Sequence, residues 1–148
     1  MAANINPIFG RTPDVQVGGS VLGPTAVTVN DGSGAYNLIF TADATEGGFV
    51  DQIILKPIGT TAATVCRVYF CTATGAFTPG TTNTAANTSL IGEITLLAYS
   101  VSNSVANNDI SIPIRKALPP GTRLLLAFGT STGAAGNGFA VTTFGMKY

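Results

Sequence analysis

Short stretches of alternating apolar and polar residues recur along this chain, and clusters of glycine, proline, asparagine and aspartate separate them. Alternation with a period of two predicts β-strands, because successive side chains of a strand point to opposite faces of a sheet. The pattern therefore predicts about eight strands separated by turns. The expected strands are residues 26–29, 36–41, 49–58, 63–72, 89–101, 109–114, 122–129 and 138–148.

Residues that favour an exposed helix are scarce. Glutamate occurs only at Glu46 and Glu93, whereas threonine, valine, glycine and asparagine are abundant. These are strand and turn residues, so we expect an all-β fold with under about 10% helix. Long polar loops, such as residues 73–88, favour crossing connections over tight hairpins. The expected architecture is a jelly-roll or Greek-key β-sandwich.

The first 24 residues show no steady period and carry three prolines and four glycines. We interpret residues 1–24 as an extended N-terminal arm and residues 25–148 as a single sandwich domain. Within the sandwich, Gly92 predicts a kink or bulge in its strand. Pro113 lacks an N–H group, which favours an edge position for the strand that contains Ile110, Ile112 and Ile114 on its inward face.

Three of the expected strands are apolar on both faces, at residues 53–55, 65–71 and 124–126. A lone antiparallel sandwich has one polar face on each sheet. The excess apolar surface predicts a homo-oligomer held mainly by hydrophobic contact, with association nearly insensitive to salt.

Both cysteines, Cys66 and Cys71, lie in one expected strand. An odd offset places their side chains on opposite faces, and about 16 Å of strand separates them. This is too far for a disulfide. We therefore expect free, buried thiols, as suits assembly in a reducing cytoplasm. The spacing also lacks the further ligands that a zinc site needs.

The chain has no histidine and only 7 basic and 7 acidic residues. Histidine is the commonest general base near neutral pH, and a serine or cysteine nucleophile needs such a partner. We therefore expect no enzymatic activity and no cofactor. No cluster of lysine and arginine is present, so nucleic acid is not an expected partner. No apolar run approaches the roughly 20 residues that span a bilayer, so we expect no membrane association.

Asp43, Glu46 and Asp51 come nearest to a carboxylate cluster. A glycosidase needs two facing carboxyl groups and calcium needs at least about six oxygens, whereas these residues are scattered over a turn and a strand. We expect solvated surface charges and no metal site. The cations that could pair with these acids are Lys56, Arg67 and Arg123.

Four stretches of the chain carry a resemblance to a known group of proteins. They are NPIF near the start, GFVDQIILKPIGTTAATVCRVYF, SLIGEITLLAYSVS and ISIPIRKALPPGTRLLLAFGTSTGAAGNGFAVTTFG. Together they cover most of residues 36–148, and they resemble tailed-bacteriophage capsid decoration (cement) proteins. The resemblance implies a jelly-roll sandwich, a homotrimer and binding to the major capsid protein on the outside of the virion. It implies assembly in the host cytoplasm and no catalytic residues.

The apolar segment of the N-terminal arm is too short and too rich in proline to build a core of its own, and it is costly in water unless it docks. Two roles are open for it: an anchor on the capsid, or a segment that folds back onto its own sandwich or a sister subunit. The residues expected to make this capsid or oligomer contact are Ile5, Pro7, Ile8, Phe9 and Arg11.

Two other classes of function are open. The first is a receptor- or glycan-binding β-sandwich of a phage fibre or spike, which predicts exposed aromatic side chains near loop tips. Phe77 and Tyr99 are the plausible ones. The second is a hydrolase on a jelly-roll scaffold, against which the absent histidine and the scattered carboxylates argue.

Overall fold

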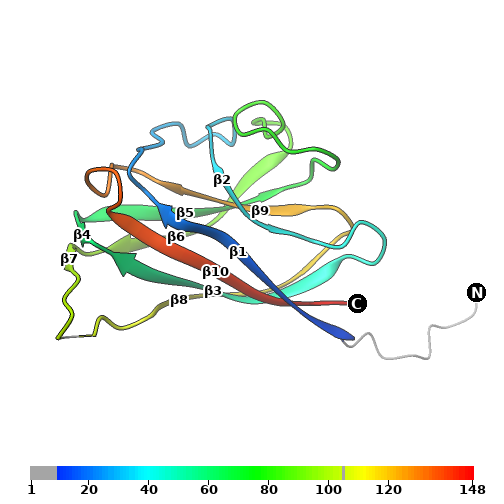
Figure 1. Cartoon of the computed structure of the whole chain (residues 1–148). Helices are drawn as coiled ribbons and strands as arrows, with labels where there is room; N and C mark the ends of the chain where they lie inside the picture. Colours follow the sequence, from blue (N-terminus) through cyan, green and yellow to red (C-terminus); the bar gives the residue numbers. More distant parts are fainter. Residues whose placement is uncertain (1–9, 105) are drawn as a thin grey trace, which may run out of the picture.

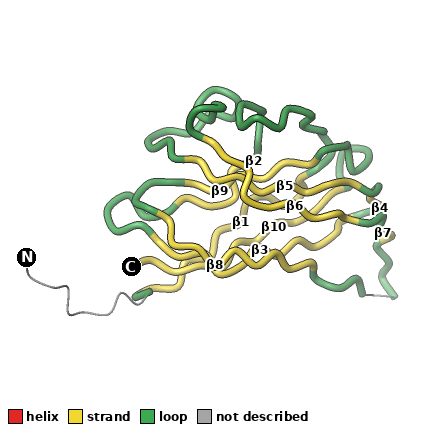
Figure 2. Tube along the Cα trace, turned by 180° about the vertical axis from the view of Figure 1, so that it is seen from behind, coloured by secondary structure: helices red, strands yellow, loops and turns green. Residues whose placement is uncertain are grey.

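The structure, a computed structural model, describes residues 10–104 and 106–148. Ten strands and no helix occur among these residues, which confirms the all-β prediction (Figures 1 and 2). The strands are β1 (Thr12–Leu22), β2 (Asn37–Thr41), β3 (Gly48–Ile58), β4 (Thr60–Thr61), β5 (Thr64–Cys71), β6 (Thr88–Leu96), β7 (Tyr99–Ser100), β8 (Ile110–Leu118), β9 (Arg123–Phe128) and β10 (Gly138–Lys147). Two of them, β4 and β7, span two residues each, so the count exceeds the expected eight.

Two four-stranded antiparallel sheets form the body of the molecule. Sheet A has the order β1-β10-β3-β8 and sheet B the order β2-β9-β5-β6, and β4 pairs with β7 in a small third sheet. Most neighbours are not consecutive in the chain, as the long loops predicted. The two sheets lie in layers, with β1 next to β2 along one side and β8 next to β6 along the other (Figures 1 and 2).

The main core lies between the two sheets. Side chains of alternating parity point inward from both layers, as the period of two predicts. The Phe128 ring on β9 stacks on the Phe139 ring on β10, with their centroids 5.6 Å apart. Other buried members from sheet A include Val50, Ile53, Leu55 and Val141, and those from sheet B include Cys66, Val68, Leu124 and Leu126.

A second, smaller core lies on the outer side of sheet B. Leu125 and Ala127 on β9 point away from the main core and are fully buried. They pack with Tyr36 and Tyr69, whose rings stack with centroids 4.1 Å apart. The covering loops gather above β2, β9 and β5 in Figure 1. The doubly apolar strand β9 is therefore buried within its own chain, so its two apolar faces are not an argument for an oligomer.

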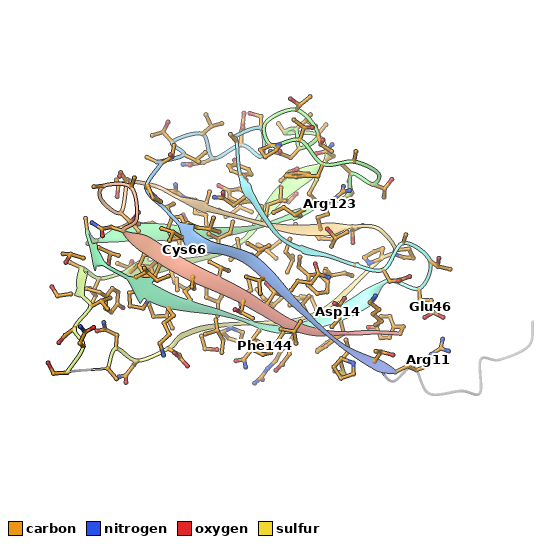
Figure 3. The ribbon with its side chains drawn as sticks, viewed as in Figure 1. Arg11, Asp14, Glu46, Cys66, Arg123 and Phe144 are labelled. Atoms are coloured by element: carbon orange, nitrogen blue, oxygen red, sulfur yellow. The ribbon has the colours of Figure 1, made fainter. Side chains whose placement is uncertain are left out.

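Arg123 fastens one of these loops to sheet B. Its side chain is buried, and its two terminal nitrogens donate hydrogen bonds to the carbonyl oxygens of Ala73 and Gly75. The guanidinium also lies over the Phe77 ring, 5.5 Å from its centroid (Figure 3 labels Arg123). Arg123 was expected to pair with an acid. It holds backbone carbonyls of the loop instead.

Two expected segments differ in the structure. Thr12–Leu22, part of the expected arm, forms β1 and pairs along β10. Residues 26–29, expected as a strand, lie outside the strands, and Val27 contributes to the second core while its N–H bonds to the Phe128 carbonyl at 2.8 Å. The chain therefore enters sheet A earlier than its turn residues indicated, and then crosses over sheet B as a covering loop.

The edge strands β6 and β8 are both bulged. On β6, Val68 pairs with Gly92 and Tyr69 with Leu90, so Ile91 is the extra residue. This confirms the predicted kink near Gly92. On β8, two residues face one on β3, and Arg115 adopts a left-handed conformation with φ of 48°. A β-bulge bends the strand and increases its local twist.

Pro113 also behaves as its missing N–H predicts. It lies on β8, which is an edge strand of sheet A. On the inward face of the same strand, Ile112 is buried, while Ile110 and Ile114 are partly buried against the main core.

The two cysteines are free and buried, on opposite sides of sheet B. Cys66 belongs to the main core and Cys71 to the second core, as the odd offset predicted. Burial raises the pKa of the Cys66 thiol to about 12, because the core cannot solvate a thiolate.

We expect the native Cys66 thiol to resist alkylation. A pKa of about 12 in place of 9.0 leaves about a thousandfold less thiolate near neutral pH. Timed iodoacetamide labelling with mass spectrometry should show slow modification in the native protein and fast modification in denaturant. The folded state also holds this proton more tightly, so its stabilising effect is complete below pH 9 and is lost between about pH 9 and 12. Rapid native labelling of Cys66 would contradict its place in the core.

Candidate interaction surfaces

The outer face of sheet A carries an apolar surface along β1 and β10. Val15 on β1 pairs directly with Phe144 on β10, and Val17 lies two residues further along. Val17 is 72% exposed, the most of any large apolar residue in the described chain, and Val15 is 52% exposed. Figure 3 shows Phe144 on this layer. We call the surface made by Val15, Val17, Phe144 and Met146 the β1–β10 patch.

Charged side chains are more numerous on the half of sheet A that lies away from this patch. Asp51 on β3 lies 3.9 Å from Arg115 on β8, and Lys56 forms an ion pair with Asp109 at 2.8 Å. Both pairs are exposed, and such pairs contribute little to stability. The β1–β10 patch is thus the less charged half of the sheet face.

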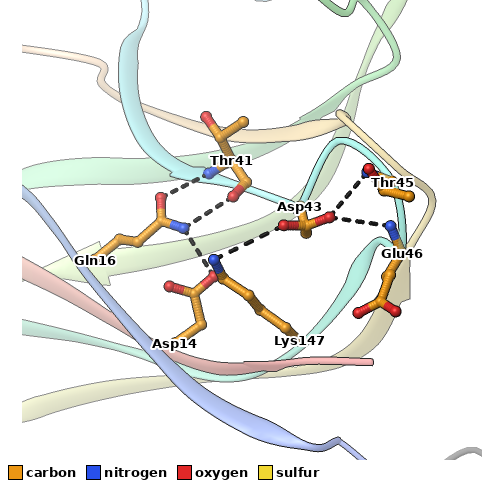
Figure 4. A network of polar contacts seen from close by, with 7 residues as sticks. All are labelled: Asp14, Gln16, Thr41, Asp43, Thr45, Glu46 and Lys147. Carbon is orange, nitrogen blue, oxygen red and sulfur yellow. Dashed lines mark hydrogen bonds and ion pairs between the residues drawn. The ribbon is translucent and has the colours of Figure 1, made fainter.

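Gln16 connects the patch strand to sheet B. Its side-chain amide donates to the Thr41 carbonyl at 2.8 Å and accepts from the Thr41 N–H at 2.9 Å, so it satisfies the edge of β2 as a neighbouring strand would (Figure 4). Its amide also donates to Asp14 at 3.1 Å. This pairing closes the side of the sandwich where β1 meets β2 and holds β1 in place.

Arg11 is the one predicted contact residue that the structure describes. Its N–H donates to the Lys147 carbonyl at 2.7 Å, and its guanidinium pairs with Glu46 at 2.7 Å at the exposed end of the sandwich (Figure 3). Arg11 therefore extends the β1–β10 pairing by one residue. The other predicted contact residues, Ile5, Pro7, Ile8 and Phe9, lie outside the described residues.

The carboxylates singled out in the sequence are separated and paired. The backbone N–H groups of Thr45 and Glu46 hold the pKa of Asp43 below its usual value by hydrogen bonding to its carboxylate (Figure 4). Asp51 lies near Arg115 instead. In residues 10–104 and 106–148, no group of three or more His, Cys, Asp or Glu residues could hold a metal ion.

The expected cation partners are also different. Lys56 pairs with Asp109, and Arg67 donates to Glu93 on the adjacent strand at 2.7 Å. The Arg67 side chain is mostly buried and pairs across two neighbouring strands, whereas Lys56 and Asp109 are both exposed. Both contacts have a structural role in the sheets.

A second apolar feature is a cleft between the bulged edges of β6 and β8. It has a volume of about 360 Å³ and opens between the two sheets. Gly92 leaves an inward position of β6 without a side chain, and a Cβ there would meet nothing within 4 Å. The lining residues are Phe70, Ile91, Gly92, Ile112, Pro113, Ile114, Lys116, Ala117 and Leu118. We call this the β6–β8 cleft, and Figure 2 views the molecule from this side.

The aromatic residues that a glycan-binding surface would use are engaged within the chain. Phe77 is partly buried against the second core and below Arg123. Tyr99 packs edge-on against Phe139, with ring centroids 6.1 Å apart. Neither forms an open aromatic platform.

Sequence reasoning missed both apolar surfaces. Val15 and Val17 alternate as a strand requires, but Pro13 and the Gly18–Gly19 pair conceal that signal. Residues of two bulges on different sheets line the β6–β8 cleft, and in the sequence only Gly92 indicated one of these bulges.

Comparisons with protein-family models, with curated protein sequences and with solved structures found no match. Within residues 10–104 and 106–148, the structure contains no helix of the length and hydropathy needed to cross a bilayer.

Proposed function

We propose that this chain is a structural virion protein that binds the outside of a phage capsid as a homotrimer and stabilises the shell. In this proposal the sandwich is of the jelly-roll type, the partners are other copies of the chain and the major capsid protein, and the protein acts by binding alone. The sequence resemblance motivates the capsid partner. The observation that carries the proposal is the β1–β10 patch.

The patch has the composition of a contact surface. Exposed apolar groups that lie together on a sheet face are favourable to bury, at about 25 cal/mol for each Å². Val15, Val17 and Phe144 lie on two paired strands, so one flat partner surface covers them together. Few charges lie among them, which fits association that is nearly insensitive to salt.

Shell stabilisation then follows from linkage. A protein that binds the assembled shell and not its separated subunits lowers the free energy of the shell by an amount that grows with its affinity and concentration. Rupture of the shell must also break the bound contacts. No reaction is needed, which suits a chain without histidine.

The patch is tested by Val17→Lys and Phe144→Lys. Burying such a side chain contributes about 1.5–3 kcal/mol, so each change should weaken self-association or shell binding by about tenfold or more. Analytical ultracentrifugation measures the first and cosedimentation with purified capsid shells the second. Both variants should fold normally, because surface changes usually alter stability by less than about 0.5 kcal/mol.

Leu97→Lys is the matched control, since Leu97 is 66% exposed but lies outside the patch. It should leave both measurements unchanged. A wild-type protein that is monomeric at micromolar concentration and fails to bind shells would contradict the proposal. Equal loss in the control and the patch variants would show that the effect is not specific to the patch.

A further inference from the structure

The β6–β8 cleft is an apolar opening beside the main core. Ile112 and Leu118 belong to the main core and also line the cleft, and Ile91 on its rim is 45% exposed. Small-ligand pockets are concave, mostly apolar and carry a few polar groups that orient the ligand. The cleft volume of about 360 Å³ lies near the lower end of their size range. It therefore suits one small, mostly apolar molecule.

The lining contains one charged side chain, Lys116. On β8 this residue pairs directly with Val50 of β3, which is fully buried in the main core. Residues that lie directly opposite each other on paired strands share a face of the sheet. Lys116 therefore lies on the inner face of an edge strand, so its alkyl stem lines the cleft. The residue is exposed, which places its ammonium group at the mouth of the cleft.

The charge of Lys116 is not balanced by an acidic residue. Of the seven basic residues in the chain, five form ion pairs with acidic side chains, and Arg123 donates to loop carbonyls. Within residues 10–104 and 106–148, the Lys116 side chain has neither kind of partner. The cleft thus combines an apolar interior with one unpaired positive charge at its mouth.

A lysine on the inner face of an edge strand also has a purely protective use. Such a charge blocks the pairing of a foreign strand at the edge of a sheet. That use needs no cleft, and it is already served on β8 by Pro113 and by the left-handed Arg115. Protection alone therefore leaves the open apolar lining beside Lys116 unexplained.

We propose that the β6–β8 cleft binds a single-chain alkyl carboxylate, with the alkyl chain against the apolar lining and the carboxylate beside the Lys116 ammonium group. The occupant follows from charge complementarity, because an anionic head on an apolar tail matches one cation at the mouth of an apolar cleft. The inference does not depend on the proposed function, since it concerns one chain and one small molecule.

Calorimetric titration of the full-length protein with sodium hexanoate, octanoate and decanoate is the first test. Burying each CH₂ group is worth about a fourfold gain in affinity, so each two-carbon step should tighten binding by about tenfold or more. Decanoate should saturate one site with a dissociation constant below about 1 mM. The absence of saturable decanoate binding, or affinity that does not rise with chain length, would overturn the proposal.

Lys116→Met tests the role of the charge, because it keeps a long apolar stem and removes the ammonium group. Wild-type protein should prefer octanoate to neutral octanol by about two- to fivefold, as expected for an exposed ion pair. In Lys116→Met this preference should vanish while octanol binding stays the same. Lys56→Met is the matched control, since Lys56 lies outside the cleft lining and pairs with Asp109. A preference that survives in Lys116→Met, or that the control also loses, would contradict the assignment.

Gly92→Leu tests the position of the alkyl chain. A Cβ at Gly92 meets nothing within 4 Å, so a leucine there should fill the cleft and weaken decanoate binding by about tenfold or more. Thr95→Leu is the control, because Thr95 lies on the same strand, pairs with Val65 and does not line the cleft. It should bind decanoate as the wild type does. Unchanged decanoate binding in folded Gly92→Leu would overturn the proposal.

The isoleucine methyl groups locate the ligand in the unaltered protein, so the test does not depend on the folding of any variant. Decanoate should shift the methyl NMR signals of Ile91, Ile112 and Ile114, which line the cleft. The Ile39 signal should stay in place, because Ile39 lies on β2 at the opposite edge of sheet B. Shifts confined to residues outside the cleft would overturn the assignment.

The acyl chain of a membrane lipid shares this chemistry, and the small volume of the cleft favours the free carboxylate. Vesicles of phosphatidylcholine and phosphatidylglycerol should therefore not sediment the wild-type protein. Sedimentation with these vesicles that Lys116→Met abolishes would assign the cleft to a membrane lipid and contradict the proposal.

Discussion

Replacing Phe139 by alanine is expected to lower the free energy of unfolding by about 3–5 kcal/mol. The ring is fully buried between the sheets, where it stacks on Phe128 and contacts Tyr99 edge-on. Its removal forfeits the burial of a large apolar surface and leaves a cavity that neighbours from both sheets line. Denaturant titration followed by circular dichroism measures the loss.

Phe144→Ala is the matched control, because it makes the same chemical change on the same strand. Phe144 is 36% exposed on the outer face of sheet A, so its truncation should cost less than about 1 kcal/mol. Equal losses of stability in the two variants would contradict the assignment of Phe139 to the inner face of β10 and of Phe144 to its outer face.

Arg123→Ala is expected to destabilise the protein by about 2–3 kcal/mol and to release residues 73–88. The guanidinium donates to the carbonyls of Ala73 and Gly75, and hydrogen bonds to charged groups contribute about 1.5–3 kcal/mol each. Relief from burying the charge offsets part of this loss. Hydrogen exchange should show faster exchange in residues 73–88 while β3 and β10 stay protected.

Arg123→Lys should recover little of this stability. An ammonium group is a single point of donation and does not reproduce the planar fork that reaches two carbonyls at once. Arg11→Ala is the control, because the Arg11–Glu46 pair is exposed and should contribute less than about 1 kcal/mol. Unchanged protection of residues 73–88 in Arg123→Ala would show that the second core holds the loop without this side chain.

Period-two alternation was sufficient to predict most of the sheets. The strand expected at residues 49–58 is β3, and the one expected at 122–129 is β9. Alternation cannot show which outward-facing residues are covered by other segments of the same chain. Because Leu125 lies on a doubly apolar strand, it was expected to face a partner subunit. The loops that bury it lie far away in the sequence, and their residues show no regular alternation of apolar and polar side chains.

The first strand was missed for a local reason. Gly18 sits where β1 approaches β2 so closely that a Cβ would lie 2.6 Å from the Cγ2 of Ile39. Glycine permits this close approach, but in a sequence a glycine usually indicates that a strand is interrupted. The same segment carries Val15 and Val17, so the candidate surface was concealed together with its strand.

The bulged edges of β6 and β8 have a consequence for how copies of this chain can accumulate. A straight, flat edge is a template on which strands stack without limit and grow into cross-β fibres. Here Pro113 and the left-handed Arg115 interrupt one edge, and the bulge at Ile91 interrupts the other. A strand that arrives at either edge can add only a few bonds before its register fails. The chain can thus be rich in β-structure and apolar residues without seeding fibrils from this side of the sandwich.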